Sequence, residues 1–162
     1  MDFVFAQKEV SDWIGQFKIS YFAPNQIITQ LFEETGELAS AIAINDLGGV
    51  EEELCDVVFG LICMANSHNI ALKNNYVCSL KSGDVFLNLS SSLGGLAREI
   101  SHMYGPKKKK YYELKSSLSE RLDSSFSAVL CFANHYNLSL DNAFSVNMDK
   151  LYGRDNNRWE KK

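Results

Sequence analysis

Two segments of this chain recur later in the same order, and this repeat constrains the fold more than any other feature. LFEETGELASAI at 31–42 aligns with LSSSLGGLAREI at 89–100, and LICMANSHNIAL at 61–72 aligns with VLCFANHYNLSL at 129–140. Each alignment has five identities in twelve positions, and the second copy has ten more residues between its blocks. A unit that recurs in the same order indicates a duplicated piece of structure.

The pattern of apolar residues predicts helices throughout the chain. It has almost none of the strict apolar–polar alternation of strands, and only two prolines occur. Pro24 suits a helix start, and Leu47-Gly48-Gly49 predicts a break between two helices. We expect helices at about 3–17, 25–45, 50–68, 84–104, 111–137 and 141–152.

These helices predict an all-α bundle in which one unit occurs twice. Residues 1–80 would form the first repeat and residues 81–162 the second, and the two would make one compact unit. At 162 residues the chain is long enough to bury a sizeable core in such a unit.

Two pairs of carboxylates occur at the same spacing in the first copy. Glu34 and Glu37 are three residues apart, as are Glu53 and Asp56, so each pair shares one helix face. Folding the two helices back on each other would bring the pairs together. At an effective dielectric near 20, each like-charge pair at about 4 Å costs roughly 4 kcal/mol. Some of these groups must therefore hold protons, or a cation must lie among them; Mg²⁺ prefers such oxygen ligands.

The alternative is an ordinary solvated helix face, and Asp56 argues against it. The residues that follow, VVFGLICMAN, are apolar nearly all round, which is typical of a buried helix. A carboxylate at the start of such a helix is rarely buried unless it is paired or bound to a metal. The sequence therefore favours a metal site.

The second copy keeps the packing residues but lacks these acids. Ser91, Ser92 and Gly95 stand in place of Glu33, Glu34 and Glu37, and Arg121 and Ser124 replace Glu53 and Asp56. We therefore expect one repeat with a metal site and one degenerate repeat without it.

The pattern Glu33-Glu34-x-x-Glu37 followed by Glu53-x-x-Asp56 resembles the signature of the MazG-like, all-α nucleoside triphosphate pyrophosphohydrolases. IGQFKISYFAP at 14–24 and ELCDVVFGLICMANSHNIAL at 53–72 also resemble this family. The resemblance implies hydrolysis of an NTP or dNTP to NMP and pyrophosphate, in the housecleaning of non-standard nucleotides. It also implies that the two repeats form a pseudo-dimer, because family members commonly assemble from two such helical units. It implies Mg²⁺, with Mn²⁺ as an alternative, held by Glu34, Glu37, Glu53 and Asp56, and Glu33 as the group that orients or deprotonates water.

Substrate contacts are expected from two other places. The C-terminal run from Lys150 through Trp159 resembles a basic segment that the family associates with substrate phosphates. Its basic residues are Lys150, Arg154 and Arg158. A solvated, frayed terminus is the alternative. Three residues just before the acidic motif could line a base pocket: Phe22, Gln26 and Gln30. The alternative for them is a packing or surface role.

Composition narrows the remaining choices. A net charge of −4 argues against a general nucleic-acid binder, and no apolar run is long enough to span a membrane. The four cysteines follow no zinc spacing, and we expect reduced thiols in a cytoplasmic protein, assembled as a homodimer of pseudo-dimers. Two alternatives stay open: an all-α dUTPase-like enzyme, because dUTPases share the acidic signature, and a non-catalytic nucleotide-binding or assembly protein.

Overall fold

The computed structural model describes residues 1–78, 83–111, 116–155 and 157–162, and these form six helices and no strand. An isolated pair of bridged residues, Phe17 and Lys161, is the one β-type contact in this part of the chain. The prediction of an all-α fold is therefore confirmed. The helices are α1 (Phe3–Ile14), α2 (Pro24–Ala43), α3 (Leu47–Ser67), α4 (Val85–Tyr104), α5 (Leu118–Tyr136) and α6 (Leu140–Arg154).

Most helices begin at a side chain that caps the first free backbone N–H groups. α2 instead starts with Pro24, which has no N–H to satisfy. At the other five N-termini an oxygen of the preceding residue accepts a hydrogen bond from the first turn, which stabilises the helix start; these residues are Asp2, Asp46, Asp84, Ser117 and Ser139.

The predicted break at Leu47-Gly48-Gly49 is displaced by three residues. The chain turns at Asn45, whose φ is 57°, and all three predicted break residues lie in the first turn of α3. Gly49 donates its N–H to the carboxylate of Asp46 at 3.1 Å. A Cβ at Gly49 would lie 2.8 Å from that carboxylate, so glycine here makes room for the cap rather than ending a helix.

Two other helix boundaries also differ from the prediction. α1 ends at Ile14, three residues early, because the backbone leaves the helix at Gly15 and pairs further on with the end of the chain. The fifth helix was predicted to start at 111, but it begins at Leu118, after the Ser117 cap. Residues 112–115 of that prediction lie outside the described part of the chain.

The two copies of the repeat form two helical hairpins, α2–α3 and α4–α5, which are the most extensive helix pairings in the fold. Both hairpins end in the same cap. Asn69 and Asn137 occupy corresponding places, with φ of 54° and 55°. Just beyond them, Ile70 donates its N–H to Ala65 and Leu138 to Ala133, both at 2.9 Å. This identity of backbone geometry supports the duplication that the sequence indicates.

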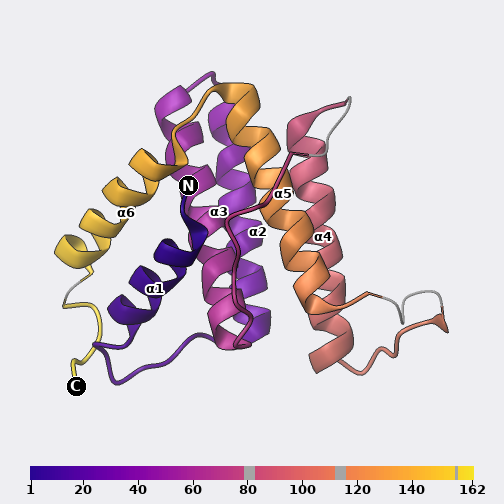
Figure 1. Cartoon of the computed structure of the whole chain (residues 1–162), viewed down its shortest axis with the longest axis horizontal. Coiled ribbons are helices and arrows are strands. Elements are labelled where there is room, and N and C mark those ends of the chain that lie inside the picture. Colours follow the sequence, from indigo (N-terminus) through magenta and orange to yellow (C-terminus); the bar gives the residue numbers. More distant parts are fainter. Residues whose placement is uncertain (79–82, 112–115, 156) are drawn as a thin grey trace.

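The hairpins lie side by side, and each helix of one contacts its counterpart in the other. α2 packs on α4 and α3 on α5, while α1 and α6 both pack on α3 at one edge of the bundle (Figure 1). A twofold relation between the repeats would generate these pairings. α3 is thus covered by helices on several sides, which explains why its apolar run is buried nearly all round.

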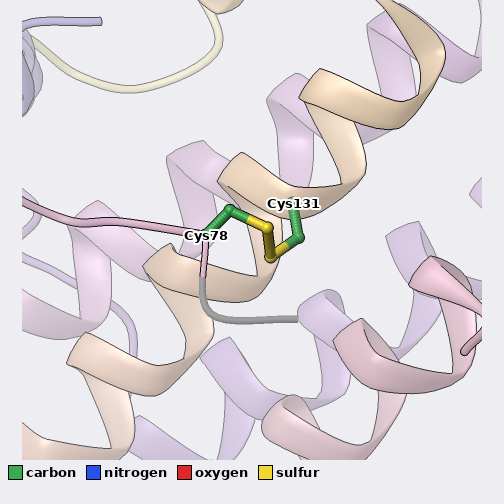
Figure 2. The surroundings of a disulfide bond; sticks show 2 residues. All are labelled: Cys78 and Cys131. Atoms are coloured by element: carbon green, nitrogen blue, oxygen red, sulfur yellow. A yellow bond between two sulfur atoms is a disulfide. The ribbon is translucent and has the colours of Figure 1, made fainter. Parts of the chain in front are cut away.

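The prediction of reduced thiols is wrong for one pair of cysteines. Cys78, which follows the first hairpin, forms a disulfide with Cys131 of α5, and their Cα atoms are 4.7 Å apart (Figure 2). The two residues are 53 positions apart, so only the packing of the inter-repeat segment on α5 brings them together. Cys55 and Cys63 are free and buried, as expected. Within the described part of the chain, no helix is both long and apolar enough to cross a membrane.

Candidate active site

Three of the four predicted metal ligands meet at the α2–α3 hairpin. Glu34 and Glu37 project from one face of α2, and Glu53 from the first turns of α3. One carboxylate oxygen from each lies within 4.8 Å of the others. The i, i+3 spacing on α2 and the antiparallel return of α3 together produce this group, which we call the acid triad.

Asp56 lies one turn beyond Glu53, outside the acid triad. Its Oδ1 accepts a hydrogen bond from Nδ2 of Asn147 on α6, at 2.6 Å. The sequence analysis missed Asn147, because no local pattern marks a residue that reaches Asp56 from 91 positions away.

The mutual repulsion of these acids favours a cation bound among them. Burial, and then repulsion from Asp56, raises the pKa of Glu34 to about 7. Burial, and then repulsion from Glu37, raises the pKa of Glu53 to about 7. Burial also raises the pKa of Asp56, although the bond from Asn147 opposes that shift. A divalent cation would relieve the repulsion, and an all-carboxylate donor set suits Mg²⁺. The residues present therefore fit the expected metal.

A cavity of about 250 Å³ begins beside these acids and runs along the α2–α3 groove. Glu34 of α2 and Asp56 of α3 line one end. The other end is lined by Ile27, seven residues before Glu34, and by Cys63, seven residues after Asp56. At 1.5 Å per residue the cavity is therefore about 10 Å long. Gly60 keeps the two helices close at its floor, because a Cβ there would lie 2.7 Å from a methyl group of Leu31.

Six aromatic side chains contribute to the remaining walls, and five of them come from the regions before α2 and after α6. The aromatic lining residues are Trp13, Phe17, Tyr21, Phe22, Phe59 and Trp159. Arginines from α6 and the segment after it complete the lining. A cavity with carboxylates at one end, arginines at the side and aromatic rings further in can take a phosphate-bearing ligand with a flat ring system.

Comparison with known proteins identifies the family. Residues 22–79 match the model of the MazG nucleotide pyrophosphohydrolase domain. The uncharacterized protein YpjD of Bacillus subtilis (strain 168) is 43% identical over 77 residues, which cover 41% of this chain and 69% of that protein. The chain belongs to the MazG family. No solved structure matches it.

The MazG match covers the whole α2–α3 hairpin and therefore all the predicted acids. α4, α5 and α6 lie beyond the matched residues. Glu33 also lies within the match. Its side chain is exposed, next to Glu34 on α2 but outside the acid triad.

Of the two basic residues predicted to bind substrate phosphates, one lines the cavity and the other does not. Arg154 lines the cavity of this MazG protein, where Asp155 accepts hydrogen bonds from its Nε and Nη2 at 3.2 and 3.1 Å. Lys150 instead points to the outer side of α3, where it pairs with Glu52 at 2.6 Å and lines a separate shallow hollow.

Gln26 does not line the cavity. Its Oε1 accepts a hydrogen bond from the N–H of Ala23 at 3.1 Å and so caps the start of α2. Phe22 and Gln30, expected with Gln26 near a base pocket, do line the cavity. A contact of any of these three residues with a base stays a prediction.

The second hairpin carries a different pair at the corresponding position. Gly95 and Arg121 replace Glu37 and Glu53, and a guanidinium nitrogen of Arg121 lies 3.2 Å from the place of a Cβ at Gly95. The missing side chain makes room for the arginine. Among the described residues, the acid triad of the first hairpin is the single cluster of three potential metal ligands.

Proposed function

We propose that this MazG protein is a Mg²⁺-dependent nucleotide pyrophosphohydrolase that converts an NTP or dNTP into NMP and pyrophosphate. The observation that carries the proposal is the acid triad beside an aromatic-lined cavity that also contains Arg154. Negative ligands for a cation, a positive group for phosphates and an apolar wall for a base are all present in one place.

In this proposal Glu34, Glu37 and Glu53 hold the metal, with Asp56 as a further ligand. When bound, Mg²⁺ would polarise phosphate oxygens and acidify a water molecule. The acids also weaken substrate binding, because their carboxylates repel the negative charges of a triphosphate. Arg154 offsets part of this charge from α6, and guanidinium groups bind phosphate oxygens through paired hydrogen bonds.

Glu33 is proposed to accept the proton of the attacking water. The water oxygen forms the new bond to phosphorus, the α–β anhydride bond breaks, and pyrophosphate leaves with the electron pair of that bond. The exposed carboxylate of Glu33 next to Glu34 is free to approach such a water. Glu33→Gln should lower kcat more than it raises KM, because its contact forms in the transition state.

Incubation with a panel of nucleoside triphosphates and Mg²⁺ tests the reaction. Pyrophosphate release, detected with an added inorganic pyrophosphatase, is expected from the purified protein and should be lost in Glu53→Gln. Release from no triphosphate, despite measurable nucleotide binding, would favour the non-catalytic alternative. Comparison of dUTP with dUDP separates the dUTPase alternative, because an all-α dUTPase should accept both. Housecleaning of non-standard nucleotides, a cytoplasmic location and a homodimer of pseudo-dimers remain predictions.

A further inference from the structure

The last residues of the chain are fastened onto the end of α1. Lys18 donates its N–H to the carbonyl of Glu160 at 2.8 Å, and Lys162 donates to Gln16 at 3.0 Å. Phe17 and Lys161 form an antiparallel bridge between these bonds. Figure 1 shows the C-terminus beside the end of α1. The segment is thus held by its backbone, and we call residues 157–162 the C-terminal clasp.

The clasp places Trp159 inside an aromatic cluster. Its ring centroid lies 5.6 Å from that of Trp13 and 5.5 Å from that of Phe17, both in edge-to-face geometry. The guanidinium of Arg158 lies over the indole, 5.2 Å from a ring centre. These contacts hold the indole in one position, and part of it forms the wall of the cavity.

This aromatic cluster borders the cavity about one helical turn beyond Asp56. Trp13 contacts Phe59, which lies one helical turn along α3 from Asp56 in the direction of Cys63. Arg154 precedes Trp159 in the chain and lines the same cavity as Asp56. A nucleotide with its phosphates between Arg154 and the acids would therefore direct its base toward Trp159.

We infer that Trp159 is the residue against which the base of the nucleotide packs, and that the C-terminal clasp is a wall of the base subsite. This inference rests on the proposed function. Packing of a base on an aromatic ring tolerates any base, because every base has a π-face. Trp159 should therefore provide affinity for nucleotides over base-free polyphosphates, and little choice among bases.

The experiment compares a nucleotide with a ligand that has phosphates but no base. In Trp159→Ala, KM for the best nucleoside triphosphate of the panel should rise about tenfold, the effect of losing one base–aromatic contact. The inhibition constant of inorganic tripolyphosphate should stay unchanged. Trp159→Phe keeps an aromatic ring and should retain most of the affinity. Tyr111→Ala is the control, because Tyr111 is an aromatic residue that is 87% exposed and does not line the cavity, and it should change neither constant.

A second measurement covers the case in which Trp159→Ala does not fold. The chain has two tryptophans, so Trp159→Phe identifies the Trp159 fluorescence in the wild type. ATP and dUTP should perturb that signal, and tripolyphosphate should not. An unperturbed signal, an unchanged KM in Trp159→Ala, or an equal loss of affinity for tripolyphosphate would each overturn the inference while leaving the proposed function in place. A wild type with neither turnover nor nucleotide binding would overturn both.

Discussion

Asn147 on α6 donates a hydrogen bond from Nδ2 to Oδ1 of Asp56 on α3, and the two atoms are 2.6 Å apart. Asn147 belongs to the second half of the chain, and Asp56 is one of the acids of the first hairpin. The bond therefore ties the helix that follows the second repeat to the candidate metal site of the first.

The Asn147–Asp56 bond should orient the carboxylate for the metal. In Asn147→Ala the pKa of Asp56 should rise further, because the bond now opposes the effect of burial. Loss of a partner that orients a metal ligand lowers metal affinity or activity by about 10- to 100-fold. Calorimetric titration with Mg²⁺ measures this directly, and Asn142→Ala, an exposed amide on the same helix, serves as the control. Equal Mg²⁺ affinity in both variants would contradict the orienting role.

The acids themselves should be essential for turnover but unfavourable for folding without metal. Glu53→Gln and Asp56→Asn should abolish pyrophosphate release. Each removes a charge from a repelling group, so the melting temperature in EDTA should stay the same or rise. A pyrophosphate-release assay with Mg²⁺ checks the first statement, and thermal melting in EDTA followed by circular dichroism checks the second. Full activity in either variant would remove that residue from the metal site.

Stability without metal should depend on pH through Glu34 and Glu53. Their pKa values in the folded protein are raised to about 7 from the ordinary value of 4.5, so the folded state binds protons more tightly than the unfolded state. Their contribution to stability is complete below pH 4.5 and is lost as pH rises through 7. In EDTA, the free energy of unfolding of the wild type should fall over this range relative to Glu53→Gln. Parallel curves for the two proteins would contradict the shift at Glu53.

Arg154 should contribute to substrate affinity from the side of the cavity. Charged hydrogen bonds are worth roughly 1.5–3 kcal/mol each, so Arg154→Ala should lower kcat/KM about ten- to a hundredfold. Lys8→Ala is the matched control, because Lys8 is an exposed cation on α1 paired with Asp12. Steady-state kinetics that show the same small effect in both variants would place Arg154 outside the substrate contacts.

The disulfide should affect stability and leave the chemistry unchanged. Closing a loop between residues 53 positions apart stabilises the fold by roughly 4 kcal/mol in the chain-entropy treatment. Cys78→Ser should therefore melt at a lower temperature than the wild type without reductant, and at the same temperature in dithiothreitol. Its kcat should match the wild type, since neither sulfur lines the cavity. If Cys78→Ser and the wild type melt at the same temperature both with and without dithiothreitol, the disulfide does not form in solution.

Local sequence patterns predicted the helices and the pairing of acids on one helix face, because both depend on residues that are close together in the chain. The spacing of Glu34 and Glu37 needs only one helix to become a pair, and Asp46 explains the start of α3 from within three residues. The misplaced break at Gly48-Gly49 shows the limit of this reasoning. Glycine commonly ends helices, but here the absence of a side chain at Gly49 leaves room for the capping carboxylate of Asp46. This role can be recognised only when the position of that carboxylate is known.

The sequence by itself determined an all-α fold, a duplicated hairpin and a set of acids on one of its two copies, because helical periodicity and repeats are properties of the chain in order. Only the tertiary structure decided what stands around those acids. Asn147 reaches Asp56 across 91 positions, Trp159 packs on Trp13 from the opposite end of the chain, and Cys78 meets Cys131. Such contacts depend on how helices pack on α3, and packing is fixed by the whole core at once rather than by any local pattern.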